Sequence, residues 1–471
     1  MNEHPLWARV DAASARFKVL ADNVWAVPET CYRETASAAL HAEELAHHGF
    51  RVTQNVADIP TAMIGEAGEG GPVIAFLGEY DALAGLSQQA DVFEQAPLEA
   101  GANGHGCGHN LLGSAAMLAA VAVKDWLAAT GTPGRVRYYG CPAEEGGAAK
   151  VFMVRAGAFD DVDAAISWHP DSIPGVMTGS SLANARIDFT FTGRASHAAA
   201  SPHLGRSALD AMELMNVGVN YLREHMPDEA RIHYAIMDGG GISPNVVQAK
   251  ARVRYVVRAA TAPEMMALLE RVRKVAAGAA MMTETQVSDS VLAAVSNLVY
   301  NPALGEAMQA NLDQLGPPPF TDMDRAYAAR FQATFSEDDI RDSYRSHGIR
   351  ENARKTLADF VVPTSVGAVP LSGSTDVADV SWVVPTVQLW GATQAIGTPF
   401  HSWQMVAQGK SQPALKGMIH AAQVMAATGA DVLLDADLRA RAKAALAAEV
   451  GPKGYVCPLP DGAEPPIAAM G

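Results

Sequence analysis

Four short segments of the sequence carry side chains that could bind metal ions or move protons. Cys107 and His109 stand two positions apart in a glycine-rich segment, and Cys141-Pro-Ala-Glu-Glu145 ends in two adjacent carboxylates. Ser167-Trp-His169 and Thr398-Pro-Phe-His401 each end in a histidine. Thiolate, imidazole and carboxylate groups are the usual ligands of zinc, and a carboxylate beside such a site can act as a general base. The set predicts a hydrolase that uses metal ions.

Each segment also has a structural explanation that involves no metal. Cys107 and His109 could be a loop thiol and a surface imidazole, a Glu-Glu pair is most often solvated, and a single histidine at a strand end is more often structural. A cysteine-protease interpretation of Cys107 leaves the pair Glu144 and Glu145 unexplained. Two adjacent carboxylates that leave a strand point in different directions, so one can bind metal while the other faces the substrate water. This division favours the metal-dependent hydrolase.

The elements that must position these segments form one expected sheet. Short apolar runs predict strands over 73–78, 135–140, 164–168 and 385–390, and an alanine-rich segment predicts a helix over 111–129. Strands that alternate with helices predict an α/β fold, with a mostly parallel sheet covered by helices on both faces. Open sheets of this kind place their sites at the C-terminal ends of the strands. The four segments are therefore expected at one edge.

A different pattern begins near residue 185. Residues 185–192 alternate polar and apolar side chains, which is typical of a half-buried antiparallel strand, and the following order is β-α-β-β-α with a further strand over 283–291. We predict an inserted α+β, ferredoxin-like domain over 186–296. The catalytic domain is then discontinuous and comprises residues 1–185 and 297–471.

Composition restricts the partners and the compartment. The chain has 51 acidic and 35 basic residues and a net charge of −16, which argues against nucleic acid or an anionic membrane as a partner. The N-terminal segment lacks the features of a secretory signal, and no stretch approaches the ~18 apolar residues that would span a bilayer. Its four cysteines are too scattered for a disulfide framework, so we expect a cytoplasmic protein.

Taken together, the motifs resemble the M20 metallopeptidases and amidohydrolases over nearly the whole chain. Any one motif is weak evidence, but their order and domain context match the family as well as their residues do. The matching segments are Gly78-Glu-Tyr-Asp81, Gly106-Cys-Gly-His109, Pro142-Ala-Glu-Glu145, Trp168-His169, Gly193-Arg-Ala-Ser-His197, Pro244-Asn245, Gly373-Ser-Thr-Asp376 and His401-Ser402.

The resemblance implies a site for two divalent metal ions, zinc or manganese. Glu144 would be the general base and then the acid, and Asp81 would hold the second nitrogen of a histidine ligand. Many M20 peptidases have a histidine where this chain has Glu79, so that ligand is absent here. The resemblance assigns no role to Asn110 or Asp376. The implied metal ligands are Cys107, His109, Glu145, His169 and His401.

The resemblance also implies roles for the inserted domain as a lid and a dimerisation surface. His197 would reach into a neighbouring protomer's active site and stabilise the oxyanion there. Asn245 and Arg258 would bind the α-carboxylate of the substrate, although Arg258 could instead pair with a surface acid. We expect a homodimer, or an assembly with a sister subunit. The implied substrate is an N-acyl or N-aroyl amino acid such as p-aminobenzoyl-glutamate or indole-acetyl-aspartate.

Two rival functions use the same residues. The chain could be a metal-binding subunit without activity of its own, or a dipeptidase or deacetylase. Every ligand position that the resemblance implies is filled, which favours an active enzyme.

Overall fold

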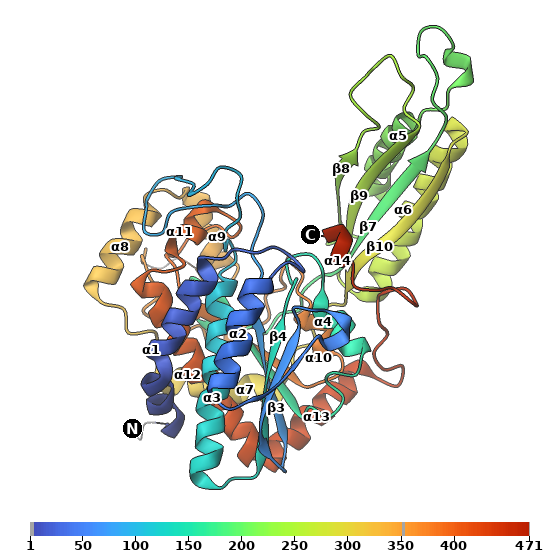
Figure 1. Cartoon of the computed structure of the whole chain (residues 1–471). Helices are drawn as coiled ribbons and strands as arrows, with labels where there is room; N and C mark the ends of the chain where they lie inside the picture. The colour runs from blue at the N-terminus through green and yellow to red at the C-terminus, as the bar shows by residue number, and fades with distance from the viewer. Residues whose placement is uncertain (1–3, 351–353, 471) are drawn as a thin grey trace.

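A computed structural model describes residues 4–350 and 354–470 (Figure 1). A seven-stranded sheet forms the centre of the larger body, in the order β1-β2-β4-β3-β5-β11-β6. Strands β4, β3, β5 and β11 are parallel, and the flanking strands are antiparallel. The predicted α/β fold with a mostly parallel sheet is confirmed. The strands are β1 (Arg51–Gln54), β2 (Met63–Glu69), β3 (Val73–Glu79), β4 (Gly134–Cys141), β5 (Ala164–Asp171), β6 (Gly175–Val176) and β11 (Thr386–Ala392).

Helices cover both faces of this sheet, because its central strands are apolar on both sides. In β3, Ile74 and Phe76 pack with the long helices of one face, whereas Ala75 and Leu77 pack with the short helices of the other. All seven residues of β3 are buried. The first face carries α1 (Pro5–Trp25), α3 (His109–Thr130), α7 (Pro302–Leu315) and α12 (Gln412–Leu434), and the second carries α4 (Ala149–Arg155) and α10 (Val377–Ser381). The helices α2 (Thr35–His47) and α13 (Ala436–Val450) lie at the periphery of the first face.

Two helices correct the expectation that no stretch is long and apolar enough to cross a membrane. In the described part of the chain, α3 and α12 both meet that criterion by length and composition. Most of each apolar window is buried inside the protein, 83% in α3 and 78% in α12. Their apolar surface is thus used by the core, as in the central helices of many globular proteins.

A second, four-stranded antiparallel sheet projects from the larger body (Figure 1). Its order is β10-β7-β9-β8, and helices α5 (Ala208–Leu222) and α6 (Ala262–Thr283) pack on one face. This is the order of a ferredoxin-like β-α-β-β-α-β module. We refer to these elements as the lid module. Its strands are β7 (Ala183–Thr192), β8 (Arg231–Asp238), β9 (Lys250–Ala259) and β10 (Gln286–Val295).

Further short helices surround the base of the lid module. α8 (Asp322–Gln332), α9 (Glu337–Arg345) and α11 (Trp403–Gln408) form a satellite of the larger body. After α13 the chain runs back to the lid module and ends its described part in α14 (Ile467–Met470). The Met470 sulfur lies 3.7 Å from Nη1 of Arg254. The C-terminal segment therefore connects the two bodies.

Candidate active site

The four segments singled out in the sequence meet at the C-terminal edge of the central sheet. Glu144 and Glu145 follow β4, His169 lies in β5, and His401 follows β11. Cys107 precedes α3, and His109 is the first residue of that helix. Parallel strands bring these residues together because their C-terminal ends share one edge.

Backbone geometry brings the ligand loops close to one another. Gly108, directly before α3, has a φ of +79°, which favours glycine. A Cβ at Gly106 would lie 2.5 Å from Cδ1 of Leu86, so no larger residue fits without movement. After β4, Ala143 also has a positive φ, and its N–H donates to Oε1 of buried Glu34 at 2.9 Å. These contacts set the direction in which the Glu144 and Glu145 side chains leave the strand.

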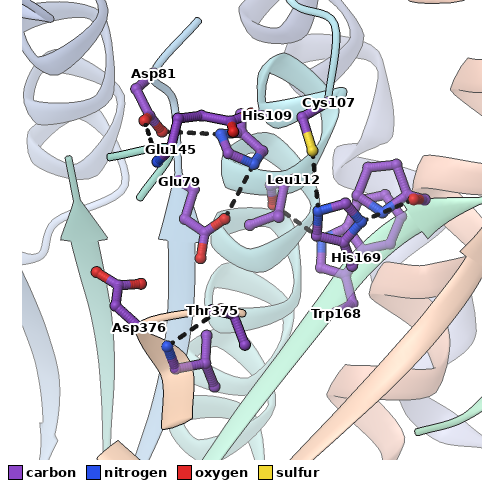
Figure 2. A network of polar contacts seen from close by, with 12 residues as sticks. Glu79, Asp81, Cys107, His109, Leu112, Glu145, Trp168, His169, Thr375 and Asp376 are labelled. Carbon is purple, nitrogen blue, oxygen red and sulfur yellow. Dashed lines mark hydrogen bonds and ion pairs between the residues drawn. The ribbon is translucent and has the colours of Figure 1, made fainter. Parts of the chain in front are cut away.

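The five predicted metal ligands form two overlapping groups that share the sulfur of Cys107. One group also contains His109 and His169, and the other contains Glu145 and His401. Within each group the candidate ligand atoms all lie within 4.8 Å of one another. Figure 2 shows the Cys107 thiol and the His169 ring directed toward one another, and their Sγ and Nε2 atoms are 3.4 Å apart.

Unsatisfied polar atoms indicate that these residues fit metal ions. Nε2 of His109 and Oε1 of Glu145 are buried and have no hydrogen-bond partner among the described residues. The other ring nitrogen of His109 is 2.8 Å from Oδ1 of Asp81, which is the contact predicted for Asp81 (Figure 2). Because that contact orients the ring, Nε2 points into the ligand group. A buried imidazole and carboxylate without partners are costly in the protein alone, and a cation would satisfy both.

The two adjacent glutamates have opposite electrostatic environments. Burial raises the pKa of Glu144 well above its usual value, and the negative charges of Glu79 and Glu145 raise it further. Burial also opposes ionisation of Glu145, but a hydrogen bond from His401 and the positive charge of His109 lower its pKa to about 2. The pair therefore provides one ionised ligand and one carboxylate that holds a proton readily.

A buried lysine behind Glu144 was not identified from the sequence. Nζ of Lys150 is 2.6 Å from Oε1 of Glu79 and 2.6 Å from Oδ1 of Asp376. The second oxygen of Glu79 lies 3.3 Å from Nε2 of His109, and Glu79, His109 and Glu144 form a third group of candidate ligands. Glu79, where many relatives of the resembled family have histidine, is thus part of a buried charge network. A lysine in the apolar helix that follows the Glu-Glu pair was the available signal.

Asn110 has a structural role instead. Its side-chain amide donates to the carbonyl oxygens of Ala21, at 3.4 Å, and Gly409, at 3.0 Å. These bonds attach the start of α3 to the end of α1 and to the loop after α11.

The predicted residues of the lid module lie in two separate places. Arg258 lines a cavity of about 360 Å³ together with Glu144, Glu145 and His401. His197 and Asn245 are exposed beyond the opposite end of the strands, where Ala198 N donates to the Asn245 carbonyl oxygen at 2.9 Å. In the register of the sheet, Arg258 pairs with Asn184 and Lys250 with Thr192, so β9 separates the two places by roughly 25 Å. Asn245 and Arg258 therefore cannot bind one carboxylate within one chain, contrary to the prediction.

The exposed His197 is nevertheless well ordered. Its Nδ1 accepts hydrogen bonds from the N–H groups of Ala199, at 3.2 Å, and Ala200, at 3.1 Å. Since Nδ1 is an acceptor, the neutral ring carries its proton on Nε2, which can donate outward.

Comparisons with known proteins agree with this geometry. Residues 75–402 match the model of peptidase family M20/M25/M40. The chain is 46% identical, over 97% of both chains, to one of the two subunits of the p-aminobenzoyl-glutamate hydrolase of Escherichia coli. It is 31% identical to the other subunit of that hydrolase, over 49% of this chain and 54% of that one. A crystal structure of a dinuclear metal-binding M20 peptidase from Bacillus subtilis has a TM-score of 0.57 and 19% identity, and the match covers 90% of this chain and 99% of that one.

The fold and the site define a hydrolase with candidate metal-binding groups at the edge of an α/β sheet. The chain belongs to peptidase family M20/M25/M40.

Replacement of Lys150 by methionine should strongly destabilise the protein, because it leaves Glu79 and Asp376 buried without their cation. Loss of one partner from a buried charge cluster costs about 3–5 kcal/mol. The matched control is Lys443→Met, since Lys443 is exposed and pairs with Asp163 at 2.6 Å; exposed pairs contribute about 0–1 kcal/mol. Urea unfolding measures both values. Equal destabilisation by the two variants would contradict a structural role for the Lys150 network.

Replacement of Glu34 by glutamine should increase stability at alkaline pH. Burial, and then the negative charge of Asp81, raise the pKa of Glu34 from 4.5 to about 8. Because the folded state keeps the proton longer, wild-type stability falls as the pH rises from about 4.5 to about 8, by about 1.4 kcal/mol for each unit of pKa difference. Glutamine removes this loss and keeps an oxygen for the N–H groups of Tyr32 and Ala143.

Denaturant unfolding at pH 5 and pH 9 measures the effect of the Glu34→Gln substitution. The advantage of the glutamine variant should grow between the two pH values. Glu34→Ala, which loses the hydrogen bonds at every pH, is the control and should be less stable throughout. A constant difference between wild type and Glu34→Gln would show that Glu34 is ionised in the folded protein.

Proposed function

We propose that this chain is a metal-dependent amidohydrolase that cleaves the amide bond of an N-acyl or N-aroyl amino acid and releases the free amino acid. The observation that carries the proposal is the cavity, where Glu144 lies beside the metal-ligand groups and Arg258 lies in the wall contributed by the lid module. The E. coli relative named for p-aminobenzoyl-glutamate supports glutamate as the released amino acid and an aromatic acyl group.

We further propose that the site holds two divalent ions, one at each ligand group. Cys107 would contribute to both groups, with His109 and His169 on one side and Glu145 and His401 on the other. One sulfur and three imidazoles suit zinc, and manganese is the alternative. When bound, such ions polarise the amide carbonyl and make water more acidic.

The residues of the chain then perform the proton transfers and hold the substrate. Glu144 takes a proton from the attacking water on its carboxylate and passes it to the leaving nitrogen. Asp81 keeps the His109 ring in place. The guanidinium of Arg258 binds the α-carboxylate of the substrate with two parallel N–H donors, and so sets the position of the amide relative to Glu144.

The proposed assembly is a dimer in which each lid module supplies His197 to the other protomer. His197 and Asn245 are exposed at the far end of the lid module, away from their own cavity. The edge strand β8 also exposes Tyr234 and Ile236, at 41% and 56%, on a sheet edge that another chain could cover. The alternative partner is a sister subunit, which the two different subunits of the E. coli hydrolase support.

Glu144→Gln should keep the bound metal and lower kcat by about 10²- to 10⁴-fold, since glutamine cannot accept the proton. Glu145→Gln is the matched control, because it removes a ligand and should lower the metal content measured by elemental analysis. Hydrolysis of p-aminobenzoyl-glutamate by the purified chain measures the activity. Loss of metal from Glu144→Gln with retention by Glu145→Gln would reverse the two assignments.

A mixture of Glu144→Gln and His197→Ala proteins should regain activity, although each variant alone is inactive. In a hybrid dimer, one site has an intact Glu144 from its own chain and an intact His197 from the partner. Exchange of protomers is followed with two affinity tags, and activity is measured on the isolated hybrid. An inactive hybrid would show that His197 does not act across the dimer.

A further inference from the structure

The lid module forms one wall of the cavity, and that wall carries two arginines. In the register of β7 and β9, Asn184 pairs with Arg258 and Arg186 pairs with Val256. Alternate residues of a strand point to the same face, and these four side chains all line the cavity. Arg186 and Arg258 are therefore diagonal neighbours, roughly 7 Å apart at the backbone.

Neither arginine is neutralised within the described part of the chain. Arg258 Nη1 donates to the Ser374 hydroxyl at 2.7 Å, and Arg186 Nη2 is 3.4 Å from the backbone oxygen of Glu145, so the partners of both are uncharged. Arg254 lies on the same face of β9 but outside the cavity, and it binds both oxygens of Asp188, at 2.7 and 3.2 Å. The lid module thus pairs its arginine outside the cavity with a carboxylate and leaves the two inside without one.

This arrangement is unfavourable for the chain alone. Burial lowers the pKa of both guanidinium groups, and the positive charge of Arg186 lowers that of Arg258 further. A partly buried charge costs free energy unless an opposite charge accompanies it. The wall is therefore suited to a ligand that brings negative charge to both positions.

We propose that Arg186 binds the side-chain carboxylate of the amino acid whose α-carboxylate binds to Arg258. The site then selects N-acyl derivatives of dicarboxylic amino acids, with carboxylates at both ends of a short carbon chain. The planar forks of two neighbouring arginines can each receive one carboxylate with two parallel hydrogen bonds. This inference rests on the proposed amidohydrolase function and adds a specificity-determining residue to it.

A purely structural role for Arg186 makes different predictions. In that case Arg186 would support the Glu145 loop through its long contact with the backbone oxygen, and its loss would weaken every substrate equally. A carboxylate-binding role affects only substrates with a charged side chain. Removal of a charge without an opposite partner should also leave the melting temperature unchanged or raise it.

The test compares p-aminobenzoyl-glutamate with p-aminobenzoyl-glutamine, which has the same size and α-carboxylate but a neutral side chain. Arg186→Ala should lower kcat/KM for the glutamate substrate by about 30-fold or more, the scale of a lost buried charge pair, and by less than about threefold for the glutamine substrate. Arg186→Lys should restore part of the difference. The matched control is Arg252→Ala, on the same face of β9 but outside the cavity and 43% exposed, which should change neither value.

Calorimetric titration with free L-glutamate and L-glutamine gives a second measure that does not require hydrolysis. Wild type should bind glutamate more tightly, and Arg186→Ala should lose that preference. Equal losses on both substrates, or no preference for glutamate in the wild-type titration, would overturn the role of Arg186 while leaving the amidohydrolase proposal intact. If the metal-loaded chain cleaves neither substrate, the proposed function fails, and the titration still decides whether Arg186 binds a carboxylate.

Discussion

The buried ammonium group of Lys150 is the interaction on which the rest of the site depends. Glu79 at the end of β3, Lys150 in the first turn of α4 and Asp376 directly before α10 form one charge cluster with almost no exposure to solvent. In a medium of low dielectric constant, the carboxylates would otherwise repel one another and Glu144. The positions of His109 and Glu144 thus depend on a balance of charge as well as on the course of the backbone.

The lid module uses the length of its strands to keep two sets of polar residues apart. Arg186 and Arg258 lie at the end that closes the cavity, whereas His197 and Asn245 lie beyond the other end. Extended strands cannot shorten, and side-chain rotation spans only a few ångström. One small sheet can therefore address its own cavity and a second molecule at once.

How far the sequence predicts this protein depends on how local each feature is. The parallel strands and the five ligand residues follow from apolar runs and short motifs, whereas the antiparallel β2, rich in glycine and glutamate, is a strand mainly because it pairs with β4. Lys150 was missed because its partner Asp376 is 226 positions away, and Arg186 because the lack of a partner is visible only in three dimensions. Asn245 and Arg258 are close in sequence, but an extended strand separates them. The exact domain boundaries and the cytoplasmic location stay predictions.

The packing of α14 also bears on when the protein becomes complete during its synthesis. A Cβ at Gly146, which lines the cavity, would lie 3.0 Å from Cε of Met470, so the loop that carries the two catalytic-site glutamates has a neighbour from the far end of the chain. At ~5–20 residues per second, a ribosome adds Met470 roughly 20–60 s after Gly146. Throughout that interval the nascent polypeptide has the ligand loops without this wall, and the finished site belongs only to the released chain.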